Sequence, residues 1–295
     1  MSPTRQDYSV DRGRPTRAPC IMNQDFVPDL NAYFDRIHYV GSQLPTLDTL
    51  HAITAHHASA IPFENVDVLL GRGIDISPGA VQQKIVQERR GGYCFETNQL
   101  LLLVLKAMGF QAGTLSARVC WQLPRSVVPP FTHMFVQVEI SGEQWITDCG
   151  MGSMSLTAAL RWQDGFVQET PHDRRRIVAE DGKWFHQVCF ADEWLDVCQF
   201  TGDEMPAVDC QVANWWTSTH PDSRFRNNLV LSRAGLDGIR RTLLNTEFTR
   251  RWKRASPETV EIRSEPQLLR VLEEEFDLIL PQNTHFENLQ FPRNS

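Results

Sequence analysis

One cysteine in this chain has the surroundings that a nucleophile needs. Cys94 follows the pair Gly91-Gly92 and begins an apolar segment that ends at Gly109, a pattern typical of a tight turn followed by a helix. The N-terminal end of a helix carries partial positive charge and free N–H groups, which favour a thiolate and can hold an oxyanion. The alternative is a buried structural cysteine after a Gly-Gly turn, and the helix argument alone does not separate the two.

A thiol nucleophile needs an imidazole beside it, and the imidazole needs a carboxylate to orient it. His133 and Asp148 lie on either side of Ser141-Gly142, which predicts a two-residue turn joining two strands. With this turn His133 pairs with Gly150, and Asp148 lies diagonally opposite on the same face, at a Cα separation of about 7–8 Å. A slip of one residue would place the two side chains on opposite faces, so the geometry is testable.

A second histidine also has an acidic neighbour. His220 precedes Asp222 in a His-Pro-Asp-Ser run, where an aspartate more often caps a turn than orients a base. Asp148 could likewise do no more than end a strand. Hairpin geometry therefore favours the triad of Cys94, His133 and Asp148 without deciding it.

Composition argues against several other classes of protein. The chain has 295 residues, of which 41% are hydrophobic and 22% charged, as in an ordinary globular protein. Its net charge of −7 argues against nucleic acid as the main partner. No apolar run approaches the roughly 18 residues that cross a membrane, so we expect no membrane partner. The first 22 residues lack the apolar segment of a signal peptide, so we expect a cytoplasmic protein.

The cysteines and the basic residues give two further expectations. The seven cysteines are an odd number, and no two form a Cys-x-x-Cys pair, so we expect free thiols and no metal site. Two short basic clusters, at 174–176 and 250–254, could face solvent or meet the phosphate of a ligand.

The elements that would position the triad change in type along the chain. Apolar residues spaced three and four positions apart predict helices at 30–37, 47–53, 78–86 and 94–109, and one more near the end, at 264–276. Thr46 and Ser77 precede two of these helices as N-cap residues. From about residue 111 the period changes to two, which predicts strands at 133–140, 145–148, 176–179, 184–188 and 229–232. Helices followed by strands and then a mixed region predict an α+β protein with segregated layers.

Five blocks of this sequence resemble the arylamine N-acetyltransferases. They occur in that family's order and spacing, within residues 25–280, and the block around Cys94 is highly specific. The blocks are Ile-Pro-Phe-Glu-Asn at 61–65, Arg-Gly-Gly-Tyr-Cys-Phe-Glu at 90–96, Thr-His at 132–133, Asp-Cys-Gly-Met-Gly at 148–152 and Asn-Trp-Trp-Thr-Ser-Thr-His-Pro-Asp-Ser-Arg-Phe at 214–225.

The resemblance implies a fold and a division into domains. The implied fold has an N-terminal helical bundle, a central small β-barrel and a C-terminal α/β lid, with a cysteine site like those of papain and the transglutaminases. We expect a flexible tail at 1–21, the helical domain with the nucleophile at 22–110, the barrel with the His and Asp at 111–210 and the lid at 211–295. The triad would lie between the first two domains.

The resemblance also implies a reaction. Acetyl-CoA would acetylate Cys94, with His133 as base and Asp148 as its orienting group, and CoA would leave. An arylamine or hydrazine would then attack the thioester, which is a ping-pong cycle.

Further residues carry over from the resemblance. The predicted loop at 217–223 resembles the part of the lid that approaches CoA, which implies cofactor contacts from Thr217, Ser218, Thr219 and Ser223. Phe63 and Tyr93 could form aromatic walls for a flat acceptor. The family usually has an aromatic residue where this chain has Met151, so acceptor preference can differ here. Arg36 and Glu64 resemble a structural ion pair of the family.

Three other functions remain open at this point. A cysteine hydrolase or transglutaminase-like enzyme has the same order of Cys, His and Asp, and it would release acetate without an amine. An amide-forming relative would take its acyl group from a carrier in place of acetyl-CoA. A non-catalytic binding protein would leave the matched triad unexplained. The acceptor amine and the oligomeric state are not specified by the sequence.

Overall fold

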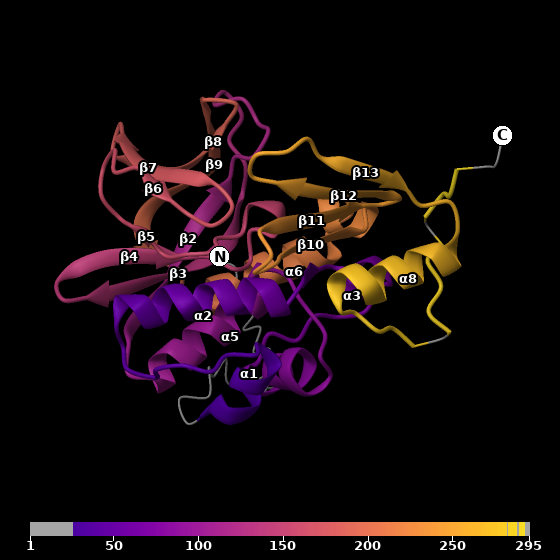
Figure 1. Cartoon of the computed structure of the whole chain (residues 1–295), viewed down its shortest axis with the longest axis horizontal. Helices are drawn as coiled ribbons and strands as arrows, with labels where there is room; N and C mark the ends of the chain where they lie inside the picture. The colour runs from indigo at the N-terminus through magenta and orange to yellow at the C-terminus, as the bar shows by residue number, and fades with distance from the viewer. Residues whose placement is uncertain (1–25, 282, 288, 293–295) are drawn as a thin grey trace, which may run out of the picture.

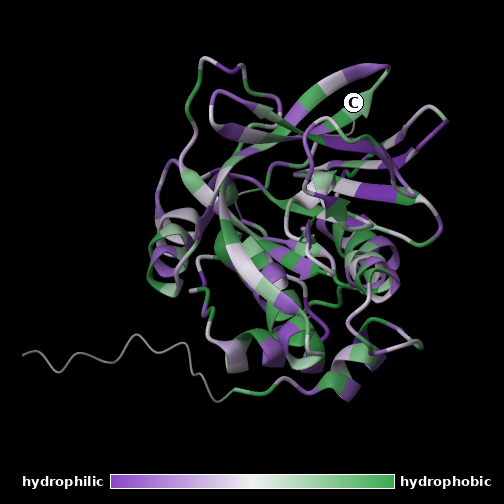
Figure 2. Ribbon diagram, turned by 90° about the vertical axis from the view of Figure 1, so that its left-hand side faces the viewer, coloured by the Kyte–Doolittle hydropathy of each residue, from purple (hydrophilic) through white to green (hydrophobic). Residues whose placement is uncertain are grey.

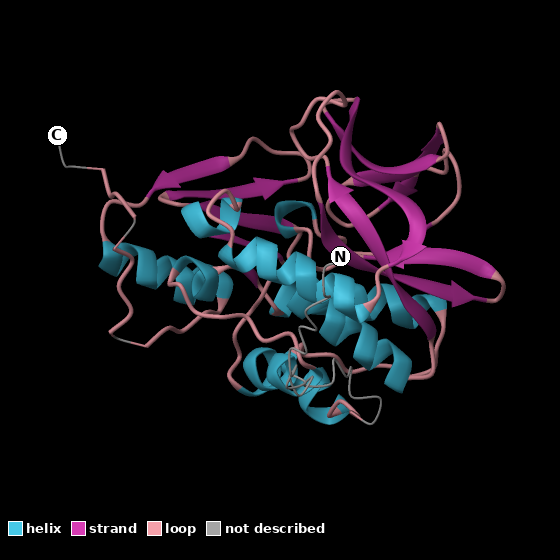
Figure 3. Cartoon of the chain, turned by 180° about the vertical axis from the view of Figure 1, so that it is seen from behind, coloured by secondary structure: helices cyan, strands magenta, loops and turns pink. Residues whose placement is uncertain are grey.

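The computed structural model describes residues 26–281, 283–287 and 289–292, so the predicted tail at 1–21 and Cys20 lie outside the described residues. Among the described residues, helices gather on one side of the molecule and strands on the other (Figure 3). Figure 1 shows the N-terminal helices below the strands of two sheets, with α8 at one end. This segregation confirms the α+β fold.

The N-terminal helices lead to the nucleophile. They are α1 (Leu30–Arg36), α2 (Leu47–Ala60), α3 (Val66–Leu69), α4 (Pro78–Gln82) with the π-helical turn η1 (Gln83–Gln87), and α5 (Cys94–Ala107). The Thr46 side chain accepts a hydrogen bond from the Thr49 N–H, as the predicted N-cap requires. Gly109 follows α5 with φ +88°, which confirms the predicted end of that helix.

The first sheet is barrel-like and antiparallel. Its order is β5-β4-β3-β2-β9-β8-β7-β6, and an isolated bridge from Asp164 to Ile177 nearly closes it. The strands are β2 (Gln111–Val119), β3 (Phe131–Ile140), β4 (Glu143–Thr147), β5 (Leu160–Arg161), β6 (Gln168–Glu169), β7 (Arg174–Glu180), β8 (Lys183–Phe190) and β9 (Glu193–Glu204). Hydrophobic and hydrophilic residues alternate along the long strands, which fits a sheet with one face toward a core (Figure 2).

The hairpin that was predicted to carry the base forms in the predicted register. Ile140 pairs with Glu143 and Val136 with Thr147, and Ser141 and Gly142 both have positive φ, of 55° and 79°. Positive φ at both turn positions is the type I′ geometry that suits a two-residue hairpin.

The second sheet joins one strand from the first third of the chain to four strands from the last third. Its order is β1-β10-β11-β12-β13, so the short strand β1 (Phe63–Glu64) lies beside β10 (Val230–Ala234). The other strands are β11 (Ile239–Leu244), β12 (Glu247–Trp252) and β13 (Glu258–Glu261). Helix α8 (Glu265–Phe276) packs its Leu268, Leu272 and Phe276 against this sheet.

Two expectations about the fold are wrong. Residues 207–219 form helix α6, and its last turn contains Thr217–Thr219, which were predicted to belong to a loop; α7 (Arg224–Asn227) follows. Arg36 does not pair with Glu64, because its guanidinium donates to the carbonyls of Ala60 and Ile85 at 2.8 and 3.0 Å. Glu64 instead pairs with Arg90 at 2.7 Å.

Candidate active site

Cys94 is the first residue of α5, and close backbone packing fixes the turn that precedes it. A Cβ atom on Gly91 would lie 2.0 Å from the Pro62 carbonyl oxygen, and one on Gly92 would lie 2.7 Å from a carboxylate oxygen of Glu96. Both positions therefore require glycine. Glu96 reaches back to accept the Tyr93 N–H at 3.1 Å, which satisfies one donor at the start of the helix.

An ion-pair network holds Glu96 in that position. Lys84 binds Glu96 at 2.7 Å and Asp67 at 2.9 Å, and Arg90 binds Asp67 at 3.2 Å and Glu64 at 2.7 Å. Its members come from β1, α3, η1 and the Gly-Gly turn, so the network ties the start of α5 to the rest of the helical region.

The predicted base and orienting carboxylate lie together beside the thiol. His133 Nε2 is 2.7 Å from Asp148 Oδ2, and both side chains are buried. The other oxygen, Asp148 Oδ1, accepts hydrogen bonds from Asn98 Nδ2 at 2.8 Å and from the Gly150 N–H at 3.0 Å. The Cys94 thiol donates to the carbonyl of Thr132, the residue before His133, at 3.7 Å. It is also close enough to the imidazole to contribute to the pKa of His133, and Nδ1 is the ring nitrogen not taken by Asp148.

The surroundings of His133 keep it charged. Burial lowers its pKa, but the charge and hydrogen bond of Asp148, together with the Cys94 thiol, outweigh burial and raise the pKa to about 10. For Asp148, burial raises the pKa, whereas the His133 charge and the hydrogen bonds to its two oxygens bring it below its usual value. The site can therefore hold an imidazolium near the Cys94 thiol at neutral pH.

The predicted acceptor-binding residues differ in their surroundings. Phe63 packs in the same apolar cluster as Cys94, and Met151 contacts the core of the barrel sheet. Tyr93 is fully buried, and its hydroxyl donates to Asn214 of α6. Its ring packs edge-on against Phe95. Tyr93 therefore connects the nucleophile's turn to α6, whereas Phe63 and Met151 flank the site.

The predicted CoA-binding hydroxyls are mostly engaged by the backbone. Ser218 Oγ donates to the Asn214 carbonyl at 2.7 Å, Thr219 Oγ1 to the Trp215 carbonyl at 2.5 Å, and Ser223 Oγ to the Thr217 carbonyl at 2.5 Å. Thr217, Ser218 and Ser223 are also buried.

The two basic clusters of the sequence meet in space. They line a cavity of about 390 Å³ between the β7–β9 strands and the end of β12, to which they contribute Arg174, Arg251, Lys253 and Arg254. His172 also lines it; this ring is buried, its Nδ1 is 3.0 Å from Thr157 Oγ1, and its Nε2 has no hydrogen-bond partner within the described residues.

Positive charge exceeds negative charge at the base of this cavity. Asp173 binds Arg240 at 2.6 Å and Arg175 at 2.8 Å, and it lies 3.7 Å from Arg251. Burial, and then the neighbouring Arg240, lower the pKa of Arg251 to about 10. Two other carboxylates also line the cavity: Glu169 binds Lys253 at 2.7 Å, and Asp192 lies 3.9 Å from Arg174. The lining thus carries four basic and three acidic side chains, an excess of one positive charge that favours an anion.

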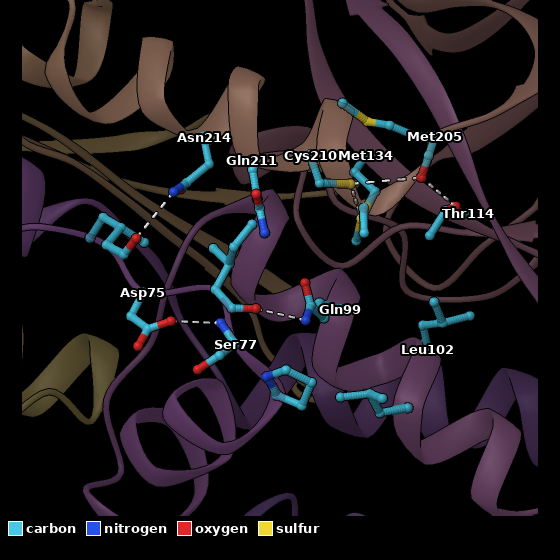
Figure 4. A pocket seen from close by; sticks show the side chains of 15 residues that line it. Asp75, Ser77, Gln99, Leu102, Thr114, Met134, Met205, Cys210, Gln211 and Asn214 are labelled. Atoms are coloured by element: carbon cyan, nitrogen blue, oxygen red, sulfur yellow. Dashed lines mark hydrogen bonds between the residues drawn. The ribbon is translucent and has the colours of Figure 1, made fainter. Parts of the chain in front are cut away.

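A second cavity lies behind the nucleophile's helix. It measures about 280 Å³ and lies between α5, α6 and residues 74–78 (Figure 4). Met134 and Cys210 form part of its wall, with their sulfur atoms 3.6 Å apart, and the same two residues pack in the apolar cluster of Cys94. Cys94 itself does not line this cavity.

Sequence reasoning missed two parts of this site. Asn98, which holds Asp148, lies four residues after Cys94, and that helical spacing was the available signal. The cationic cavity was signalled only as two separate basic clusters, because nothing local indicates that they meet. Within residues 26–281, 283–287 and 289–292, no group of three or more His, Cys, Asp or Glu could hold a metal ion. Over the same residues, no helix is long and apolar enough to cross a membrane.

Comparisons with known proteins agree on one family. A sequence model of a family described as N-acetyltransferase matches residues 46–285. A Salmonella typhimurium protein named arylamine N-acetyltransferase / N-hydroxyarylamine O-acetyltransferase is 38% identical over 249 residues, which are 84% of this chain and 88% of that protein.

Solved structures are similar over most of their length. The Salmonella typhimurium arylamine N-acetyltransferase matches with a TM-score of 0.82 and 36% identity, covering 88% of this chain and 95% of that one. The Mycobacterium marinum arylamine N-acetyltransferase in complex with CoA matches with a TM-score of 0.81 and 34% identity, covering 84% and 92%.

Proposed function

This chain belongs to the arylamine N-acetyltransferase family, and from that premise we propose that it moves the acetyl group of acetyl-CoA to an arylamine or hydrazine nitrogen through a thioester on Cys94. One observation carries the proposal: Cys94 begins a helix within reach of an imidazole that a buried carboxylate keeps charged. A thiolate and imidazolium so arranged form the pair that acyl transfer through cysteine requires.

The first half-reaction consumes the imidazolium's proton. The Cys94 thiolate attacks the acetyl carbonyl, the bond from that carbonyl carbon to the CoA sulfur breaks, and His133 gives its proton to the departing CoA thiolate. The products are acetyl-Cys94, neutral His133 and free CoA. Asp148 holds the ring in one orientation throughout, through its 2.7 Å contact with Nε2.

The second half-reaction restores that proton. The amine nitrogen attacks the thioester carbonyl, the carbon–sulfur bond to Cys94 breaks, and His133 takes a proton from the nitrogen. The products are the acetylated amine, the Cys94 thiolate and the imidazolium with which the cycle began. No group outside the triad has to store a charge between the two steps.

The cationic cavity is the place where the phosphates of acetyl-CoA would bind. Its lining has four basic and three acidic side chains, and Arg251 and Arg254 offer guanidinium groups that suit phosphate oxygens. Met151 and Phe190, which lines the cavity, both pack against the small apolar cluster of Met154, Val188 and Val197, so the cavity and the residues beside the triad share one supporting cluster. The four hydroxyls from Thr217 to Ser223 are weaker candidates for CoA contacts, because three already donate to the backbone.

The acceptor would lie against Phe63 and Met151, beside the thioester. Phe63 offers a flat apolar ring near Cys94, and Met151 offers a flexible thioether in place of the family's usual aromatic residue. We place the enzyme in a reducing compartment such as the cytoplasm, because the six cysteines that the structure describes are all unpaired thiols.

The test is to incubate the enzyme with acetyl-CoA and no amine, and to locate the modification by peptide mass spectrometry. We expect one acetyl group, on Cys94, which an arylamine then removes. Cys94→Ser should abolish transfer, whereas Cys120→Ser, a matched loss of a thiol away from the triad, should leave it unchanged. Steady release of acetate without an amine would instead identify a hydrolase, and acetylation elsewhere would refute the proposal.

A further inference from the structure

Asn98 lies on the same face of α5 as the nucleophile. It follows Cys94 by four residues, which is close to one helical turn, so the two side chains leave the helix in nearly the same direction. The side chain is fully buried, with an exposed fraction of 0%. A buried amide needs partners for its polar atoms, and all of those recorded for Asn98 lie on the hairpin that carries the base.

The amide of Asn98 makes three hydrogen bonds with that hairpin. Its Nδ2 donates to Asp148 Oδ1 at 2.8 Å and to the Met134 carbonyl at 2.7 Å. Its Oδ1 accepts the Cys149 N–H at 2.8 Å. Met134 follows His133 on β3 and Cys149 follows Asp148 after β4, so each backbone contact lies one residue from a member of the triad.

We propose that Asn98 is a positioning residue of the acetyl transfer: it fixes the carboxylate of Asp148 and sets the helix that carries Cys94 against the hairpin that carries His133. The inference rests on the function proposed above. A carboxylate held at one oxygen by Asn98 and the Gly150 N–H presents its other oxygen to the imidazole and cannot rotate away. The same amide binds the backbone beside His133 on β3 and beside Asp148 just after β4. These contacts would hold the Cys94 sulfur and the His133 ring at a fixed separation.

The chemistry of the position accounts for an asparagine there. An apolar residue would leave the Met134 carbonyl and the Cys149 N–H buried without these partners, at a cost of about 1–3 kcal/mol for each group. An aspartate would retain the acceptor for Cys149 but bring a second negative charge to Asp148, which disfavours the ionised state of both groups. Only a side chain with a donor and an acceptor at this distance serves all three contacts.

The experiment compares Asn98→Ala and Asn98→Asp with a matched control on the next residue. Gln99 also donates its amide to a buried backbone carbonyl, that of Ile76 at 2.7 Å, but it does so in the cavity behind α5 (Figure 4). Gln99→Ala therefore removes a similar hydrogen bond from the same helix without touching the hairpin. Circular dichroism and thermal unfolding identify the variants that fold.

Two readouts separate positioning from a merely structural role. The first is the rate of Cys94 alkylation by iodoacetamide between pH 5 and 9, which reports the thiolate without acetyl-CoA. The second is the division of the kinetic effect between kcat and the KM for acetyl-CoA. For Asn98→Ala we expect kcat to fall roughly 10- to 100-fold, KM to stay within about twofold, and the alkylation midpoint to move to higher pH.

Asn98→Asp keeps the shape of the side chain, so it tests the positioning role of Asn98 even if the alanine variant does not fold. We expect its transfer rate to be lowest at high pH and to recover in part as the pH falls, because a protonated carboxyl can again donate to Asp148. Gln99→Ala should match the unchanged enzyme in both readouts.

The remaining outcomes distinguish failure of the positioning role from failure of the proposed acetyl transfer. If Asn98→Asp kept the unchanged enzyme's kcat and alkylation profile, Asn98 would have no positioning role, although loss of transfer in Cys94→Ser would still uphold the proposed function. If Cys94 were never acetylated but both Asn98 variants shifted the alkylation midpoint, the positioning role would stand and the acetyl transfer would fail.

Discussion

At the scale of single residues, the proposed mechanism requires one buried imidazole, that of His133, to be charged. Burial alone would strip the proton from His133, as it does at the equally buried His186, whose pKa burial lowers to about 3 with Arg175 beside it. Asp148 and the Cys94 thiol reverse that effect for His133 and raise its pKa to about 10. Two histidines of the same sheet thus have opposite charge states, set by the neighbours that each one faces.

Asp148→Asn should remove this charge. An amide cannot supply the negative charge that holds the imidazolium, so burial dominates and the pKa of His133 falls below neutrality. The proton of His133 is then lost as pH rises well before pH 7, whereas in the unchanged enzyme it is retained to about pH 10. We expect transfer to fall by roughly three to four orders of magnitude in a steady-state assay.

The pair of His220 and Asp222, the other histidine with an acidic neighbour, supplies the control for Asp148→Asn. His220 Nδ1 lies 4.0 Å from Asp222, whose side chain is 88% exposed, so this pair is solvated. Asp222→Asn should therefore leave the transfer rate unchanged within about twofold. An equal loss in both variants would mean that Asp148 is not the orienting group.

At the scale of elements, the triad depends on how closely the hairpin approaches α5. A Cβ atom on Gly150 would lie 2.5 Å from Cys94 Cα and 2.7 Å from Asn98 Nδ2. No flexible side chain lies at the first of these contacts, so any larger residue must push the backbone segments apart.

Gly150→Ala should consequently loosen the site and the fold together. We expect a loss of about 1–3 kcal/mol in the free energy of unfolding, measured with urea, and a lower transfer rate. Gly73 is the matched position, because a Cβ atom there meets nothing within 4 Å. Gly73→Ala should change the free energy of unfolding by no more than about 0.5 kcal/mol, and a similar value for Gly150→Ala would contradict the close approach.

The elements that sequence predicted well are those that local chemistry specifies. Ser141-Gly142 fixed the hairpin register, and with it the diagonal of His133 and Asp148, because a two-residue turn leaves one pairing. Helix α6 escaped prediction because its pattern is blurred: Val208, Val212 and Trp215 are exposed, whereas Asn214 and Ser218 are buried. Such a helix is held by tertiary partners that periodicity does not report.

Hydrogen bonds between residues far apart in the sequence were also not predicted. The sequence does not indicate which acceptor the Arg36 side chain uses. In the structure it donates hydrogen bonds to backbone carbonyls of two other segments, those of Ile85 and Ala60. The hydrogen bond from Asn98 to Asp148 joins residues 50 apart in the chain. Their pairing depends on how a helix and a sheet pack, which a single sequence does not state.

At the scale of the whole molecule, the barrel sheet and the C-terminal sheet both contribute basic residues to the cationic cavity. Arg174 comes from β7, Arg251 from β12, and Lys253 follows β12, so neither sheet alone makes the cavity. If acetyl-CoA uses it, the attraction depends on charge and should weaken with salt.

Arg251→Gln should therefore raise the KM for acetyl-CoA about tenfold, the equivalent of one charge-assisted hydrogen bond of about 1.5 kcal/mol. The KM for S-acetyl pantetheine, which lacks the nucleotide and its phosphates, should not change. Arg125→Gln is the control, because Arg125 pairs with Asp196 and Glu180 outside the cavity. An equal rise for both acetyl donors would exclude phosphate recognition by Arg251.

The pairing of β1 with β10 has a consequence for how the reactive thiol comes into being. Phe63 bridges to Gly92 on one side and pairs with Ser232 on the other, so the turn before Cys94 abuts a sheet whose remaining strands come from the last third of the chain. During synthesis, the segment bearing the sulfur leaves the ribosome long before those strands exist. A chain that ends before β10 therefore lacks the strand that pairs with Phe63 and Glu64 beside the Gly-Gly turn, so this turn is packed on one side only until synthesis is nearly complete.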